Sequence, residues 1–162
     1  MKFNYQALKA IYLHEMDRFR RTLTQSLLSP VLSTSLYFIV FGSVIGGYVQ
    51  KIDGISYGSY IVPGLLMLTL LTQSISNTSF GIFFPKFNGT IYEILAAPIS
   101  TFEVVLAFVG AGATKTLIVG VMIFLTSMFF VDVEVKYPLL MIFLLVLVSF
   151  TFALFGLSLI HI

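Results

Sequence analysis

Four long apolar runs, separated by short polar segments, dominate the pattern of the chain. They extend over residues 27–49, 58–80, 104–131 and 138–160. An α-helix needs about 20 mostly apolar residues to cross the hydrocarbon core of a bilayer, and each run provides that length. The pattern therefore predicts an all-α integral membrane protein with four transmembrane helices, in a single domain over residues 1–162.

The composition agrees with a membrane protein. Of the 162 residues, 58% are hydrophobic and 10% are charged, and the mean hydropathy is +1.02. A typical soluble domain has about a quarter of its residues charged. The first apolar run is far longer than the apolar region of a signal peptide, so we expect it to remain in the membrane as a spanning helix.

Residues 3–23 predict an amphipathic helix ahead of the first span. Apolar side chains recur there at steps of three and four residues, the spacing of one helix face. These positions are Tyr5, Leu8, Tyr12, Met16, Phe19 and Leu23, and the nearby cations are Lys2, Lys9, Arg18, Arg20 and Arg21. Such a helix is typical of the headgroup region, with its cations toward anionic lipid. A soluble helix that binds a partner protein is the alternative.

The basic residues also predict the orientation of the chain. The N-terminal segment and the loop after the second span hold six of them, whereas the two other loops hold only Lys51 and Lys136. The six are Lys2, Lys9, Arg18, Arg20, Arg21 and Lys86. Because cytoplasmic segments carry the excess of Lys and Arg, the N-terminus is predicted to be cytoplasmic.

The first span contains a pair of small residues for helix packing. Gly42 and Gly46 have the small-xxx-small spacing that lets a second helix approach closely. The general tolerance of membrane helices for glycine explains the same pair equally well.

The second span carries a polar stripe in its second half. Thr69, Thr72, Gln73 and Ser76 recur at helical spacing, and Asn77 follows. Polar groups in hydrocarbon are costly, so this stripe should face protein or water. Hydrogen bonding between helices is the favoured explanation, and lining a translocation path is the alternative.

The segment 88–100, between the second and third spans, predicts a short helix. Gly89 precedes Thr90 and Glu93, which have the spacing of a capping box. Pro98 should end the helix because the residue before a proline is driven out of helical geometry. We expect its apolar side to consist of Ile91, Ile94 and Leu95. A simple surface linker is the alternative.

Lys115 is a cation inside the third apolar run. If the helix starts at Val104, Lys115 lies about 16 Å along it at 1.5 Å per residue. It must then either extend to the headgroups or face other helices. We expect it to extend toward the basic, cytoplasmic side.

Several kinds of chemistry lack their residues. Residues 110–116 end in Lys-Thr as a P-loop does, but Val109 and Thr114 stand where that motif needs glycine. The chain has no cysteine, and His14 and His161 do not make a metal site by their spacing. No acid–base pair and no aromatic-interleaved basic patch is evident. We therefore expect no catalytic residue, bound cofactor, metal site or nucleic-acid partner.

The order of these elements resembles the membrane permease subunit of ABC-2 type exporters. The resemblance rests on the central pattern of Gly89, Thr90, Glu93, Leu95 and Pro98, followed by Ile99-Ser100. The segments 36–42 and 60–65 are similar to those of bacterial inner-membrane transport permeases. It covers nearly the whole chain and implies a multi-pass protein of the bacterial inner membrane.

The resemblance implies a function in ATP-driven export. A second permease copy, identical or different, would complete a dimeric pore, and separate cytoplasmic ABC ATPase subunits would bind and hydrolyse ATP. The segment 88–100 would be the coupling helix that enters the ATPase, with Gly89, Thr90, Glu93, Leu95 and Pro98 as its characteristic residues. The helix over 3–23 would lie beside it at the membrane surface, and the first two spans near the dimer seam.

The chain also departs from the family pattern. Family members have six spans where four are predicted here, and residues 157–162 do not resemble the family's continuation. We therefore expect a C-terminally truncated permease. A non-transporting structural or assembly protein and a fragment of a secondary transporter are the alternatives, although the latter should bury several ionisable groups and show an internal repeat. The substrate is not encoded in any of these patterns.

Overall fold

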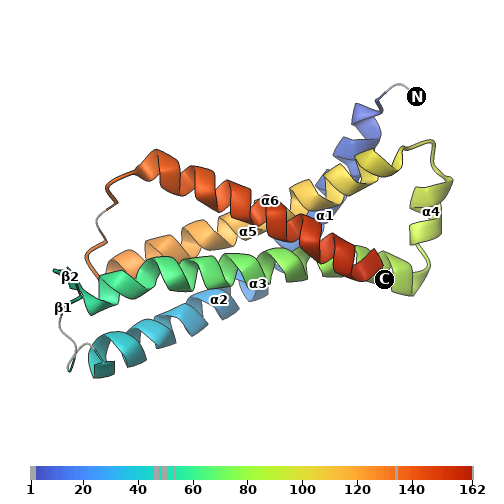
Figure 1. Ribbon diagram of the computed structural model, residues 1–162. Coiled ribbons are helices and arrows are strands. Elements are labelled where there is room, and N and C mark those ends of the chain that lie inside the picture. The colour runs from blue at the N-terminus through green and yellow to red at the C-terminus, as the bar shows by residue number, and fades with distance from the viewer. Residues whose placement is uncertain (1–2, 46–47, 49–50, 53, 134, 162) are drawn as a thin grey trace.

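The structure, a computed structural model, describes residues 3–45, 48, 51–52, 54–133 and 135–161. Described residues form six α-helices, a π-helical segment and a small hairpin. They are α1 (Tyr5–Arg21), α2 (Leu23–Tyr37), η1 (Phe38–Ile45), β1 (Lys51–Ile52), β2 (Ile55–Ser56), α3 (Tyr57–Asn88), α4 (Ile91–Ala96), α5 (Thr101–Phe130) and α6 (Pro138–His161). Figure 1 shows a long bundle with α4 at one end and the hairpin at the other.

Four of the helical segments are long and apolar enough to cross a membrane, as the sequence predicted. They are Leu23–Gly42, Tyr57–Asn88, Thr101–Phe130 and Pro138–Ile160. The last two match the predicted runs within a few residues. The second continues past the predicted end at Phe80 to Asn88, where Gly89 stops it in a left-handed conformation with φ of 79°.

The end of α3 carries aromatic rings in mutual contact. Phe83 packs against Phe80, Phe84 and Phe87 with ring centroids 6.0–6.4 Å apart. With 32 residues, α3 is about 48 Å long, which exceeds the roughly 30 Å of a hydrocarbon core. One end of α3 must therefore extend beyond that core.

The N-terminal helix, α1, ends at Arg21. Thr22 has φ of −105° and ψ of 16°, outside helical geometry, and separates α1 from α2. Its hydroxyl donates to the carbonyl groups of Arg18 and Phe19, both at 3.3 Å. At the other end, the side chain of Asn4 accepts from the amide of Ala7 at 3.2 Å. The predicted helix over 3–23 is thus confirmed over Tyr5–Arg21.

Helix α3 is at the centre of the packing and contacts both α5 and α6, while α1 and α2 pack on α5. Leu66 and Leu70 of α3 form an apolar cluster with Leu145 of α6. Ala113 of α5 and Ala153 of α6, both fully buried, form a second cluster with Val109. The two alanines of the second cluster let the backbones of α5 and α6 come close.

The two loops at the hairpin end lie together. Lys51 pairs with Ser56 and Ile52 with Ile55, around Gly54 with φ of 82°. The hydroxyl of Ser59, in the first turn of α3, donates to the carbonyl group of Asp132 at 2.9 Å. This hydrogen bond joins the start of α3, directly after the hairpin, to the loop after α5.

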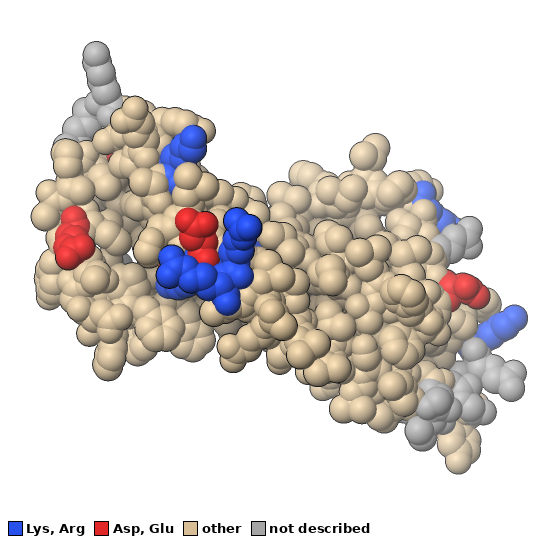
Figure 2. Space-filling view, turned by 180° about the vertical axis from the view of Figure 1, so that it is seen from behind, with Lys and Arg blue, Asp and Glu red and all other residues tan. Residues whose placement is uncertain are grey.

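The surface is apolar over long stretches. Exposed side chains on α6 include Leu139, Phe143 and Leu147, with 83%, 63% and 48% of their surface accessible. On the face drawn in Figure 2, Lys, Arg, Asp and Glu gather in two groups, and an uncharged stretch separates them. An uncharged belt between charged regions is typical of a protein surface that contacts lipid.

Candidate functional site

The short helix α4 is the first candidate, and it occupies the segment in which the sequence predicted a helix. It covers Ile91–Ala96, between the end of α3 and the start of α5 (Figure 1). Ala97 is extended, with ψ of 150°, and Pro98 follows. The prediction that the helix ends before Pro98 is therefore confirmed.

The predicted capping box of α4 is wrong. Thr90 has helical backbone angles, φ of −66° and ψ of −12°, and its side chain makes no capping hydrogen bond. A capping side chain needs an extended backbone to reach the free amides of the first turn. Gly89 serves instead as the left-handed C-cap of α3. The hydroxyl of Thr90 points back to the carbonyl group of Pro85, at 3.5 Å.

A capping box does form one element later, at the start of α5. The Ser100 side chain accepts from the amide of Glu103 at 3.3 Å, and the Glu103 carboxylate accepts from the amide of Ser100 at 2.8 Å. Ser100 is extended, with ψ of 149°. The loop after α4 is thereby fixed to the first turn of α5.

Helix α4 buries none of its side chains within this chain. Tyr92 and Leu95 are 72% and 68% exposed, and Glu93 is exposed beside them. Ile91 and Ile94 are half-buried, so the predicted apolar side is divided: the two isoleucines face the bundle and Leu95 faces away. The outer side of α4 combines two large apolar groups with one carboxylate.

The polar stripe on α3 lies on the outside of the bundle. Thr72 and Ser76 are exposed, and Thr69, Gln73 and Asn77 are half-buried. The hydroxyls of Thr69 and Thr72 donate to carbonyl groups of their own helix, those of Leu65 and Leu68, at 2.9 Å. Within the described part of the chain these two hydroxyls do not join one helix to another, and the exposed Thr72 and Ser76 face the surroundings.

Other polar residues of α3 make the bonds between helices. Ser74 is fully buried, and its hydroxyl donates to the carbonyl group of Ser149 on α6 at 2.5 Å. Ser79 donates to the carbonyl group of Gly156 at 2.8 Å. Ser74 lies outside the predicted polar stripe, although it is four residues before Thr78, which is also buried.

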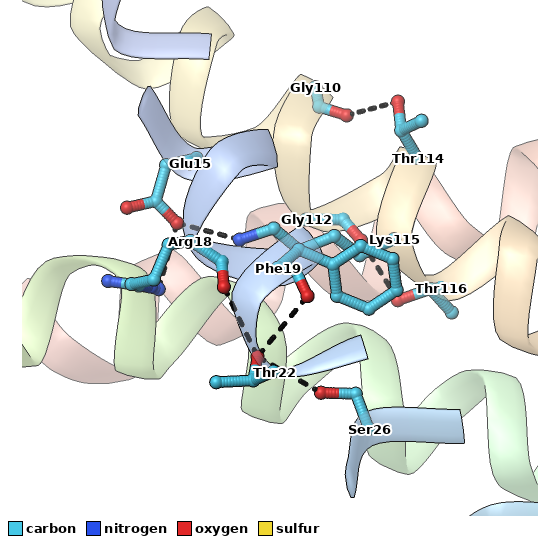
Figure 3. Close-up of polar contacts among 10 residues, drawn as sticks. All are labelled: Glu15, Arg18, Phe19, Thr22, Ser26, Gly110, Gly112, Thr114, Lys115 and Thr116. Atoms are coloured by element: carbon cyan, nitrogen blue, oxygen red, sulfur yellow. Dashed lines mark hydrogen bonds and ion pairs between the residues drawn. The ribbon is translucent and has the colours of Figure 1, made fainter. Parts of the chain in front are cut away.

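Lys115 does not extend to the headgroups, so that expectation is wrong. Its ammonium group donates to Glu15 Oε2 of α1 at 2.7 Å, and Arg18 pairs with the same oxygen at 2.8 Å (Figure 3). The side chains of Lys115 and Glu15 are only 4% and 3% exposed. A carboxylate held between two cations offsets the cost of burying the Lys115 charge.

The P-loop-like residues 110–116 form a helix crossing. A Cβ atom on Gly112 would lie 2.1 Å from Thr78 Oγ1 of α3, and one on Gly110 would lie 4.0 Å from the ring of Tyr12. Absence of a side chain lets α5 approach α3 closely at Gly112. Gly112 therefore serves packing, whereas Gly110 leaves room for a Cβ atom beside Tyr12.

The predicted packing pair consists of Gly42 and Gly46, and Gly42 makes no close helix contact in the described structure. A Cβ atom on Gly42 would meet nothing within 4 Å, so no described part of this chain packs against it. Gly46 lies outside the described residues. Close approach between helices instead occurs at Gly112, Gly120 and Gly156, which face Thr78, Leu70 and Ile75 of α3.

Comparison with known proteins assigns the family. The family described as "ABC-2 type transporter" matches residues 6–162. The chain is 38% identical over 157 residues to inner membrane transport permease YadH of Escherichia coli strain K12, and equally to that of Escherichia coli O157:H7 and of Shigella flexneri. The alignments cover 97% of this chain and 61% of each relative, so the chain spans about 61% of their length. No solved structure matches. The chain belongs to the ABC-2 type transporter family and is homologous to an inner membrane transport permease.

Proposed function

We propose that this chain acts as the permease subunit of an ATP-driven exporter in the bacterial inner membrane, and that α4 is the helix on which a cytoplasmic ABC ATPase acts. The observation that carries the proposal is the exposure of α4, which lies at the end of two long helices and buries none of its own side chains. Family membership and the homology to a transport permease support the same function.

The connections of α4 suit a mechanical role. Gly89 ends α3 immediately before α4, and the Ser100–Glu103 capping box starts α5 immediately after it. Neither connection contains a long loop. A force on α4 therefore acts directly on α3 and α5, which extend through the bundle as continuous helices of 32 and 30 residues. Closure of ATPase subunits around ATP would supply that force and change the arrangement of the spans.

The outer side of α4 has the chemistry of a docking element. Tyr92 and Leu95 provide apolar surface for a cleft in the partner, and Glu93 provides a charge that can pair with a cation on it. Aromatic and aliphatic anchors of this kind carry most of the binding energy in protein interfaces. The permease contributes no hydrolytic group in this proposal, and ATP is bound by the ATPase.

The translocation path is proposed along the polar stripe of α3. Thr72 and Ser76 are exposed, and Thr69, Gln73 and Asn77 are half-buried beside them. Polar side chains in this position avoid lipid if a second permease copy covers them, and the same copy would complete a path between the two. The excess of basic residues in the N-terminal segment and at the end of α3 supports a cytoplasmic location for the N-terminus and α4.

Co-purification tests the proposal. The permease is expressed from its natural gene with the ABC ATPase encoded beside it, solubilised in mild detergent and purified through a tag on the permease. Glu93→Arg should reduce the amount of bound ATPase, and Asp132→Arg, the same change of charge at an exposed site near the hairpin, should not. Equal binding by both variants, or no ATPase bound to the unmodified permease, would refute it and favour a structural role.

A further inference from the structure

Three side-chain contacts join α1 to the first half of α5. The amide of Asn4 donates to Glu103 Oε1, the hydroxyl of Tyr12 donates to Thr114 Oγ1 at 3.1 Å, and Lys115 donates to Glu15 at 2.7 Å. Partners in each contact are 99 to 102 residues apart in the sequence.

The order of these contacts shows that the two helices lie side by side and run in the same direction, because the partners advance together along both. From Asn4 to Glu15 the chain advances about 16 Å, and from Glu103 to Lys115 it advances about 18 Å, at 1.5 Å per residue. Helix α1 packs on α5 over this length, and Phe19, one helical turn after Glu15, is buried. The two helices are therefore joined at both ends of a shared stretch.

The Glu15–Lys115 pair sets the register of this stretch. Both side chains are nearly inaccessible, and Glu15 Oε2 accepts from Lys115 and from Arg18 (Figure 3). A shift of α1 along α5 by one helical turn, about 5.4 Å, would separate the charges and leave Lys115 buried without its carboxylate. Apolar contacts alone would resist such a shift far less, because they depend little on direction.

The joined stretch of α1 and α5 lies between α4 and the first candidate span, which begins with α2. Glu103 contacts Asn4 and also closes the capping box that follows α4. At its other end, α1 leads into the first candidate span, α2, through the single non-helical residue Thr22. Helix α2 also packs directly on α5. Displacement of the start of α5 therefore reaches the N-terminal end of α2 through α1 as well, provided that α1 and α5 remain in register.

The structure assigns Glu15 and Lys115 as positioning residues that lock α1 to α5, so that both helices move as one body when α4 is displaced and carry the movement to α2. This assignment rests on the proposed function of α4. Stability alone is a poor reason for the pair, because replacing a buried ion pair by apolar residues of similar size is often neutral or stabilising.

Substitution of both partners separates positioning from stability. Glu15→Met with Lys115→Met removes both buried charges. Arg18 loses Glu15 as its partner, but its side chain is 35% exposed and can be solvated. The double variant should therefore fold and melt at or above the temperature of the unmodified protein. It should still bind the ATPase through α4, while the hydrolysis that the permease stimulates falls about tenfold, within the usual range of coupling between sites. Asp17→Asn, which removes an exposed carboxylate two residues from Glu15, is the matched control and should have no effect.

A double variant that stimulates hydrolysis like the unmodified permease would overturn the assignment and leave the pair a structural role. If the unmodified permease binds no ATPase, the proposed function of α4 is refuted, and the coupling role of the pair with it. The two failures are distinct because the first leaves binding intact.

A distance measurement tests the lock itself. The chain has no cysteine, so Leu13→Cys on α1 and Phe102→Cys on α5, both exposed positions, accept spin labels without background. The distribution of distances between the labels should be the same with and without an ATP analogue on the complex, and it should broaden in the double methionine variant. A shift caused by the analogue in the otherwise unmodified protein would show that α1 moves on α5 and would overturn the assignment.

Discussion

Gly156 of α6 rests directly on the backbone of Ile75 of α3. A Cβ atom on Gly156 would lie 2.7 Å from the carbonyl oxygen of Ile75 and 2.9 Å from its Cα atom. No side-chain rotation can relieve a clash with backbone atoms, so Gly156→Ala must push the two helices apart. We expect a loss of about 1–3 kcal/mol, the usual cost of overpacking a close interface.

The melting temperature of the purified protein in detergent measures this loss. Gly64→Ala on α3 is the control, because a Cβ atom there would meet nothing within 4 Å. Alanine also has the higher helix propensity, so this variant should melt at the same temperature or slightly above. Equal melting of both variants would mean that α3 and α6 are less close than described.

Ser100 and Thr90 both stand three residues before a glutamate, but their replacement by alanine should change the stability of the protein unequally. Ser100→Ala removes an accepted hydrogen bond and the capping box, and we expect a cost of about 1 kcal/mol. Thr90→Ala should be nearly neutral, since the Thr90 side chain caps nothing. Chemical or thermal unfolding in detergent compares the two, and a larger effect at Thr90 would contradict the observed caps.

The ion pair of α1 and α5 should respond unequally to removal of either partner. Glu15→Gln leaves the buried Lys115 ammonium group without a carboxylate, because Glu15 is its only ion-pair partner among the described residues. Breaking a buried pair in this way costs about 3–5 kcal/mol. Lys115→Met should cost less because Arg18 still pairs with Glu15. Thermal unfolding of the two single variants measures the order, and equal costs would show that Arg18 does not compensate.

The length of an apolar run is a local property, and for this reason the four spans could be predicted. The end of α3 was missed because residues 81–88 contain Pro85 and Lys86, yet no residue stops the helix before Gly89. The boundary between the N-terminal helix and the first span was predicted at residues 23–27, and the structure has it at Thr22, because the first residues of α2 are helical as well.

The contacts of the candidate site were harder to predict. Both Thr90–Glu93 and Ser100–Glu103 have the spacing of a capping box, and only the backbone angles, which the sequence does not reveal, select the second. The Glu15–Lys115 pair joins residues 100 positions apart. Two signals did exist: Glu15 falls between Tyr12 and Phe19 on the apolar stripe of α1, and Lys115 lies in an apolar run, so each buried charge required an opposite one.

The orientation of the chain can be tested by labelling. Tyr92 on α4 and Tyr137 before α6 are 72% and 74% exposed and lie near opposite ends of the bundle. A cysteine at Tyr137 should react with a membrane-impermeant maleimide added to spheroplasts, whereas one at Tyr92 should react only after permeabilisation. The reverse pattern would place α4 outside the cell and would exclude contact with a cytoplasmic ATPase.

The central claim is that the ATPase acts on α4, and site-specific cross-linking in native membranes tests it most directly. A single cysteine at Leu95, carrying a photoactivatable cross-linker, is compared with one at Leu139, which is equally apolar and 83% exposed at the start of α6. The account predicts a covalent permease–ATPase product from Leu95 and none from Leu139. No product from Leu95, or equal products from both positions, would contradict it.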